Sequence, residues 1–464
     1  MAHSATKMQA AVVGRVGGTV AEHYAQYISA LRYEALPEHV VRLAKFCLTD
    51  AIGCTIFGKR FPWSQMVLDQ TLTSGSRGPC TIPGVVSAAL DPSKAALVLG
   101  AMAHAFELDS LAKPGMGVHP GATVALPALA VAQAQDVGGS DLIAAIVAGC
   151  EIMFRVGAAT LHSLESVGFH APGITGVFGA AAATAALMKL PPRAIANAFG
   201  IAGSMGTGLL AFAKSGSGGM VKRLHLGRAG ESGISATQLA SRGYEGPLAI
   251  FEGQYGVLDA YCPENAPVLL LMGLGETFEI ERICFKRYAC HVTAHAPVQF
   301  LRGLIEQGVF SGNDIASIEL EMSEKVVSAH ANAVPGDIML AQYSVPFTTA
   351  IAAFHDPNDP RVFSADVLKD PRVLQLASRI ALRGQPGLTK GWDGTMRIRL
   401  ANGETHGGEL TSFLGTPETP FSEDGLKAKF ERLVQDEAPH LRSRLFADLM
   451  HIEQFERVND LALT

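Results

Sequence analysis

The stretch SDLIAAIVAGCEIMFRVGAAT, Ser140–Thr160, predicts the dominant structure of this chain. Its apolar residues recur three and four positions apart, which is the spacing of one buried face of an α-helix. The same spacing runs over residues 20–270, where the alternation typical of strands is scarce. Ser140 and Asp141 precede the apolar run as a helix cap would, and Pro191–Pro192 predicts the start of a further helix. These features predict an all-helical first domain.

The pattern changes in the second half of the chain. Residues Ile315–Ala329 and Thr395–Leu410 alternate apolar and polar side chains, and Asn402–Gly403 within the second run is typical of a hairpin turn. Two helical runs lie between these strands, Ser344–Phe354 and Ser364–Leu382. Strands mixed with helices in this way predict a small α+β unit.

A chain of 464 residues exceeds what one hydrophobic core usually serves, so we expect more than one domain. The expected fold is mainly α with a smaller α+β domain. Residues 1–280 form the first part of the helical domain, residues 281–412 form the α+β domain, and residues 413–464 are C-terminal helices that return to the helical domain.

Composition narrows the function classes. The net charge is −6, and no run of Lys or Arg forms the basic patch that binding to nucleic acid requires. The seven cysteines form no CxxC pair, which predicts reduced thiols rather than a zinc or disulfide framework. The apolar run Gly173–Leu187 is too short to span a membrane and predicts a buried helix. We expect a cytoplasmic protein without nucleic-acid or membrane partners, and its small apolar side chains favour a homodimer.

Two glycine-rich segments resemble cofactor-binding motifs but lack residues that those motifs require. The segment GSGGMVK, Gly216–Lys222, lacks the consecutive Gly-Lys-Ser/Thr of a P-loop, and GLGE, Gly273–Glu276, lacks the third glycine of a dinucleotide fingerprint. The residues around Ser232 do not form a nucleophile elbow, and the sequence contains no HExxH. We therefore expect neither a nucleotide nor a metal cofactor.

Four segments concentrate ionisable residues among apolar ones. They are HAFELDSLAKPGMGVHPGA (His104–Ala122), SVGFHAPG (Ser166–Gly173), MVKRLHLGRAGESG (Met220–Gly233) and CFKRYACHVTAH (Cys284–His295). Their excess of histidines and cations over acids predicts a ligand with two or three carboxylates. Histidine, lysine or tyrosine can remove a proton next to a carboxylate when nearby cations stabilise the developing charge. Each segment also has a structural interpretation: a solvated helix end, a core histidine, a solvated basic face or a linker.

Together with AQYSVPF, Ala341–Phe347, these segments resemble the MmgE/PrpD family in order over nearly the whole chain. The resemblance implies a homodimer with a large helical domain, an inserted α+β lid domain and an active site in the cleft between them. It implies the catalytic residues His119, His170, Lys222, His291 and Tyr343. The same segments supply the expected substrate-binding residues Glu107, Asp109, Arg223 and Lys286.

The resemblance implies a cofactor-independent lyase that abstracts a proton next to a carboxylate of a small di- or tricarboxylic acid, with a dehydratase of the 2-methylcitrate type first. Alternatives are an epimerase of a dicarboxylate such as iminodisuccinate, a decarboxylase of the cis-aconitate type, or a non-catalytic anion-binding dimer. One motif departs from the family. Where dehydratases and decarboxylases usually read DFDDT, this chain reads ELDSL, Glu107–Leu111, which leaves the substrate open.

Overall fold

The computed structural model describes residues 17–213, 219–388 and 391–464, so the start of the segment Gly216–Lys222 lies outside the described residues. The chain divides into two compact units. Unit 1 comprises Met1–Ala105, Asp109–Ile283 and Leu433–Thr464, and unit 2 comprises Phe106–Leu108 and Cys284–Arg432. Unit 2 thus extends beyond residue 412, through most of helix α17 (Glu423–Val434).

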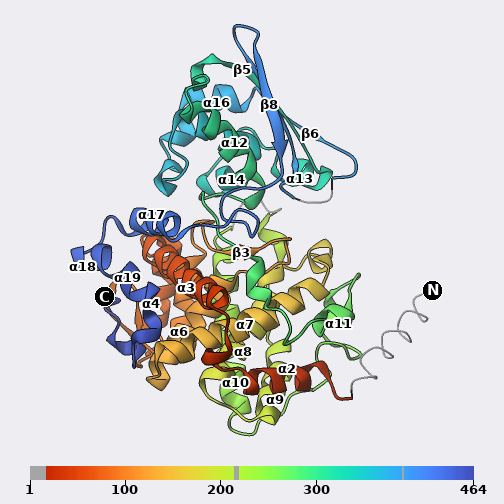
Figure 1. The fold of residues 1–464 in the computed structure, drawn as a ribbon, viewed down its shortest axis with the longest axis vertical. Coiled ribbons are helices and arrows are strands. Elements are labelled where there is room, and N and C mark those ends of the chain that lie inside the picture. The colour runs from red at the N-terminus through yellow and green to blue at the C-terminus, as the bar shows by residue number, and fades with distance from the viewer. Residues whose placement is uncertain (1–16, 214–218, 389–390) are drawn as a thin grey trace, which may run out of the picture. The chain divides into compact units, whose positions relative to one another are not determined.

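Unit 1 is built around three helices that lie side by side in Figure 1: α7 (Gly139–Ala159), α8 (Ala171–Leu187) and α10 (Val221–Ala240). Small residues allow this close packing. A Cβ atom on Gly149 of α7 would lie 2.8 Å from the carbonyl oxygen of Gly179 on α8, so both helices need glycine there. Around them lie α2 (Val20–Ala30), α3 (Glu38–Gly58), α4 (Pro62–Thr73), α5 (Pro92–Ala103), α6 (Leu126–Gln135), α9 (Pro192–Gly203), α11 (Val257–Tyr261), α18 (Pro439–Ser443) and α19 (Leu445–Met450).

The first residues of helices α9 and α7 can be compared with the predicted helix starts. Helix α9 begins at Pro192, as predicted. Helix α7 begins earlier than expected, at Gly139 with Gly138 as its N-cap residue, and Ser140 and Asp141 lie in its first turn instead of capping it. Among the described residues, α7 is long and apolar enough to cross a membrane, but 89% of its apolar window is buried inside the protein, as in a core helix.

The expectation of an all-helical first domain is wrong, because unit 1 contains short strands. Strands β1 (Cys80–Ile82) and β2 (Val85–Leu90) form an antiparallel hairpin in unit 1. Its turn contains Gly84 in the left-handed region (φ +75°), and β-branched residues flank the turn. Strands this short are difficult to recognise in the sequence because helical apolar spacing surrounds them. Two further strands have two residues each, β3 (Leu111–Ala112) and β4 (Ile283–Cys284).

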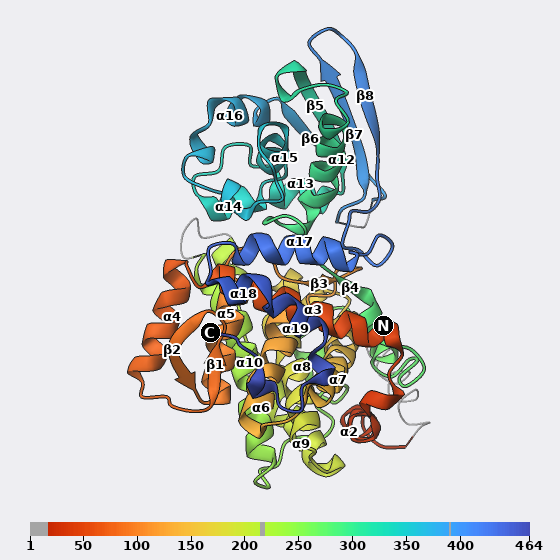
Figure 2. The ribbon, with the colours of Figure 1, turned by 60° about the vertical axis from the view of Figure 1, so that its left-hand side comes forward.

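Unit 2 contains a four-stranded sheet in the order β6-β5-β7-β8, which Figure 2 shows. Its strands are β5 (Ile315–Met322), β6 (Ile380–Gly384), β7 (Gly394–Leu400) and β8 (Thr405–Leu410). Strand β6 is parallel to β5, and the other neighbours are antiparallel. The β7–β8 hairpin turns at Asn402–Gly403, as predicted. The helices of this unit are α12 (His295–Glu306), α13 (Glu324–His330), α14 (Ile338–Tyr343), α15 (Val345–Phe354), α16 (Pro371–Ala377) and most of α17.

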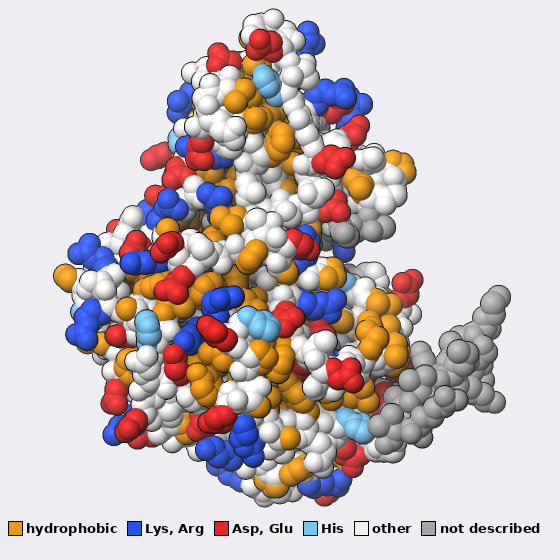
Figure 3. All heavy atoms as spheres, viewed as in Figure 1, with side chains coloured by type: hydrophobic (Ala, Val, Ile, Leu, Met, Phe, Trp, Pro, Cys, Tyr) orange, Lys and Arg blue, Asp and Glu red, His pale blue; other side chains and the backbone are white. Residues whose placement is uncertain are grey.

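Two elements of unit 2 are shorter than the sequence predicts. The strand expected over Ile315–Ala329 ends at Met322, because Ser323 caps helix α13 with its hydroxyl. The helix expected over Ser364–Leu382 is limited to the 3-10 turn Val367–Lys369 and to α16, and Ile380 begins strand β6, opposite Ile318 of β5. The fold is mainly α with a smaller α+β component. On the face drawn in Figure 3, acidic and basic side chains are interspersed rather than gathered by sign.

Candidate active site

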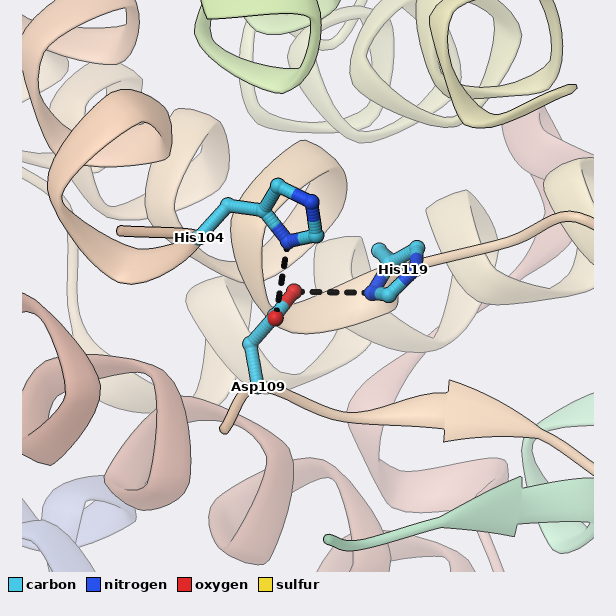
Figure 4. A group of neighbouring side chains, drawn as sticks. All are labelled: His104, Asp109 and His119. Carbon is cyan, nitrogen blue, oxygen red and sulfur yellow. Dashed lines mark hydrogen bonds and ion pairs between the residues drawn. The ribbon is translucent and has the colours of Figure 1, made fainter. Parts of the chain in front are cut away.

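A carboxylate in unit 1 connects two imidazoles. His104 follows the last residue of α5, Asp109 lies in the loop after it, and His119 precedes the π-helical turn Gly121–Ala125. The Nδ1 atom of His104 lies 2.9 Å from Oδ1 of Asp109, and Nδ1 of His119 lies 2.8 Å from Oδ2 (Figure 4). His104 and Asp109 are fully buried, whereas the His119 side chain is 14% exposed.

These hydrogen bonds determine the tautomers of both rings. Burial opposes ionisation of Asp109, but the two imidazoles outweigh it and lower the pKa of that carboxyl well below its usual value. An ionised carboxylate only accepts hydrogen bonds, so His104 and His119 each donate from Nδ1. In the neutral form each ring then carries its lone pair on Nε2. His119, the more exposed of the two, has the tautomer that a general base needs.

A second imidazole pair lies nearby in unit 1. His170, the N-cap residue of α8, has its ring centroid 6.4 Å from that of His104. Its Nδ1 atom lies 3.1 Å from Nδ1 of His225 on α10. Burial lowers the pKa of both His170 and His225, and the charge of Lys222 lowers both further. Both imidazoles are therefore neutral at pH 7.

Two buried cations stand at the start of helix α10. Lys222 and Arg223 are 4% and 2% exposed and occupy its first turn. The helix dipole is also positive at this end, so the side chains and the backbone together favour an anion. Arg228, one turn further on, is half-exposed and forms an ion pair with Glu231, which matches the structural interpretation of that residue.

Among the described residues, His104, Asp109 and His119 form the one group whose atoms could hold a metal ion, lying within 4.8 Å of one another. In the observed arrangement both carboxylate oxygens of Asp109 accept imidazole N–H groups. A metal bound at Nδ1 of these rings would have to displace the two protons that form the hydrogen bonds, so coordination there and the observed hydrogen bonding exclude one another. This donor set fits hydrogen bonding better than coordination.

Unit 2 holds its own group of ionisable residues. Glu107 is buried with its backbone in the left-handed region (φ +56°). Its Oε2 atom accepts a hydrogen bond from Nζ of the buried Lys286 at 3.0 Å, and its Oε1 atom lies 3.4 Å from the hydroxyl of Tyr343. Gln342 supports this segment, because its amide donates 3.0 Å hydrogen bonds to the carbonyls of Phe106 and Ala289.

Three rings lie together at the Tyr343 end of this group, with His291 stacked on His330 and both tilted against Tyr343. The centroid of His291 lies 4.2 Å from that of His330 and 5.1 Å from that of Tyr343. His330 also approaches the carbonyl of Tyr343, 2.9 Å from its Nδ1 atom. The sequence analysis missed His330, because a lone histidine at a helix end carries no motif. It assigned no role to Gln342, although that residue lies within AQYSVPF.

The structure divides the predicted residues between the units. Unit 1 contains Asp109, His119, His170, Lys222 and Arg223, and unit 2 contains Glu107, Lys286, His291 and Tyr343. Glu107 and Asp109, which were expected together, belong to different hydrogen-bonded groups. His295 has its ring against Tyr288 and Phe413 and is fully buried. Its pKa is lowered by burial, as in a core histidine.

Two protein-family models match this chain. The MmgE/PrpD N-terminal domain matches residues 22–269, and the MmgE/PrpD C-terminal domain matches residues 288–450. The chain belongs to the MmgE/PrpD family. Similar proteins include a cis-aconitate decarboxylase of Aspergillus terreus, 26% identical over 96% of this chain and 94% of that protein. The cis-aconitate decarboxylase of Mus musculus is 25% identical, over 89% and 86% of the two chains. A cis-aconitate decarboxylase-like protein of Aspergillus oryzae is 30% identical, over 62% of each chain.

Acid should destabilise unit 1 of this MmgE/PrpD member. Burial is the main cause that lowers the pKa of His104, from 6.5 to about 3. Between these two pKa values the imidazole of His104 is protonated in the unfolded chain but stays neutral in the folded protein. The stabilising contribution is complete above pH 6.5 and is lost as the pH falls towards 3. At pH 5 the loss is about 2 kcal/mol for one such imidazole.

Urea unfolding between about pH 7.5 and pH 5 measures this dependence. The chain has two tryptophans, so a Trp392→Phe background leaves Trp63 to report on unit 1. His104→Asn retains an N–H donor for Asp109 but cannot titrate, so its stability should fall less steeply with acid. Equal slopes for the two proteins would show that His104 does not titrate in this way.

The Glu107–Lys286 pair should behave as a coupled unit. Lys286→Met leaves a buried carboxylate without its ammonium partner, at an expected cost of about 3–5 kcal/mol, and Glu107→Gln leaves the ammonium buried. The double variant should lose less than the sum of the two, by at least about 1 kcal/mol. Urea unfolding in a Trp63→Phe background, where Trp392 reports on unit 2, measures the cycle. Additive losses would rule out a direct interaction.

Proposed function

We propose that this chain is a lyase that acts on a small di- or tricarboxylic acid and uses protein side chains alone to move a proton on carbon next to a carboxylate. One observation carries the proposal: Asp109 accepts N–H groups from two imidazoles and thereby leaves His119 with a basic Nε2 atom. The buried cations Lys222 and Arg223 of the same unit supply the charge that a carboxylate ligand and its developing negative charge require.

The candidate site residues of unit 1 receive the following catalytic roles, which their positions support. His119 exchanges a proton with the substrate carbon through Nε2, and Asp109 orients that ring. Lys222 stabilises negative charge on the substrate. Burial, with the charge of Lys222 as a second cause, lowers the pKa of His170 and keeps that ring neutral, so that His170 can give a proton or take one. For Lys286, His291 and Tyr343 we retain the predicted roles in substrate binding and catalysis, which substitution can test one residue at a time.

Within this class we place decarboxylation of an unsaturated tricarboxylic acid first, because the similar proteins are named for cis-aconitate decarboxylation. Loss of CO2 from a β,γ-unsaturated carboxylate leaves an electron pair that shifts the double bond and takes a proton at the far alkene carbon. One proton is consumed in each turnover, so an acid must be present.

Dehydration is the second candidate. It requires a base for the carbon-bound proton and an acid for the departing hydroxyl, and His119 and His170 can supply one each. The named relatives give no support to the isomerase alternative.

A substrate panel followed by proton NMR tests the proposal. We expect purified protein to convert one of cis-aconitate, citrate, 2-methylcitrate, malate or tartrate, and to leave iminodisuccinate unchanged. Release of CO2 identifies the decarboxylase, and loss of water identifies the dehydratase. Inversion of iminodisuccinate without bond cleavage, or no reaction across the panel, would contradict the lyase.

A further inference from the structure

His225 on α10 contacts His170, and the proposed function gives His225 no role. The two Nδ1 atoms lie 3.1 Å apart, a hydrogen-bond distance between two nitrogen atoms. His170 is 5% exposed, whereas His225 is half-buried. The ring of Phe212 forms T-shaped contacts with both imidazoles, its centroid 5.4 Å from that of His170 and 5.9 Å from that of His225.

Gly208 leaves the room that this pair occupies. Its backbone has φ +138°, and a Cβ atom there would lie 3.2 Å from Nδ1 of His225 and 3.5 Å from Cβ of His170. Its carbonyl accepts the backbone N–H of His170 at 3.0 Å. The loop that holds His170 at the start of α8 therefore also brings His225 close to it.

The hydrogen bond restricts where the protons lie. Burial and the charge of Lys222 lower the pKa of both rings, so neither carries a net charge at pH 7. Two neutral imidazoles that share an Nδ1···Nδ1 hydrogen bond hold one proton between them, and they must be opposite tautomers. The ring that donates from Nδ1 has a free lone pair on Nε2, and its partner carries a proton on Nε2.

We propose that His170 and His225 form a two-imidazole proton relay, in which His225 exchanges protons with the medium on behalf of His170. This relay rests on the proposed lyase function, because decarboxylation consumes one proton in each turnover. His225 acts through His170 and is a positioning and relay residue.

The proton transfer needs no reactant other than water or buffer. His170 gives its Nε2 proton to the substrate carbon, and the shared proton moves from Nδ1 of His225 to Nδ1 of His170. Nε2 of His225 then takes a proton from water or buffer. Both rings end neutral with their tautomers exchanged. After product leaves, a hydronium ion or buffer acid that enters the emptied site gives a proton to Nε2 of His170, the shared proton moves back to Nδ1 of His225, and Nε2 of His225 returns a proton to the medium, which restores both rings for the next turnover. The buried His170 never has to become a cation.

Two substitutions separate the relay from a merely structural contact. His225→Asn places an amide near the position of Nδ1 and retains a hydrogen bond to His170, but it cannot pass a proton on. His225→Ala removes both. For the substrate that the wild type converts, we expect kcat to fall about 100-fold in both variants with little change in KM. Free imidazole should restore part of kcat in His225→Ala. His39→Ala, which removes an exposed histidine paired with Glu281, is the matched control.

A second measurement does not depend on activity. In protein labelled with ¹⁵N-histidine, NMR should detect a scalar coupling between the Nδ1 nuclei of His170 and His225 across the hydrogen bond, and its loss in His225→Ala. Wild-type kcat in His225→Asn, or no coupling in the wild type, would overturn the relay. Coupling without turnover of any substrate in the panel would instead show that the lyase function fails, and the relay with it.

Discussion

We expect Asp109→Asn to lower kcat by about 10²- to 10⁴-fold while both units stay folded. The carboxylate accepts one imidazole N–H on each oxygen, whereas an amide offers only one oxygen. The amide nitrogen meets an N–H group, so His104 or His119 must take the other tautomer. A His119 ring with its proton on Nε2 has no lone pair there, so it cannot take a proton from carbon in the dehydration, and it cannot be re-protonated at Nε2 after giving a proton in the decarboxylation.

Glu151→Gln is the control for this variant. Glu151 is another buried carboxylate of unit 1, paired with Arg155 at 2.7 Å and bonded to the backbone N–H of Glu279. Its replacement should lower stability without lowering kcat in folded protein. If Asp109→Asn retained full kcat, Asp109 would not orient the base, and the proposed mechanism would fail at its first step.

Lys222→Met should lower kcat/KM by about 100-fold, equivalent to about 3 kcal/mol, because a buried ammonium that meets a carboxylate is removed while the apolar stem is kept. Loss of this charge also removes one cause that lowers the pKa of His104, His170 and His225. The acid limb of the pH profile should therefore move to higher pH.

Lys94→Met provides the comparison. Lys94 lies on α5, pairs with Glu231 at 2.6 Å and has a side chain that is 37% exposed, so we expect little change in kcat/KM. Steady-state kinetics from about pH 5 to pH 9 measure both variants. An effect of Lys94→Met as large as that of Lys222→Met would point to general destabilisation instead of a specific role in the site.

Periodicity predicted the long elements of the fold well, because helices such as α7 and α8 are held by many small apolar residues in a regular spacing. It failed where the element was short or where tertiary pairing decided. The β1–β2 hairpin is one case, and strand β6 is another, since Ile380 becomes a strand residue by pairing with β5.

The candidate site was predictable as residue types and only partly as geometry. Motif order supplied His119, His170 and Lys222, but it could not show that Asp109 holds two imidazoles or that Glu107, two residues earlier, pairs with Lys286. Those pairings depend on how the loop after α5 is folded. His225 was noticed within a basic segment, yet its contact with His170 requires the conformation of Gly208.

The most direct test of the lyase proposal is turnover in deuterated buffer after dialysis against a chelator, with cis-aconitate first and the rest of the panel after it. We predict that product forms at the same rate before and after chelation, and that product or recovered substrate carries deuterium on carbon next to a carboxylate. A rate that returns only when a metal is added, or no product and no deuterium with any substrate, would contradict proton transfer by side chains alone.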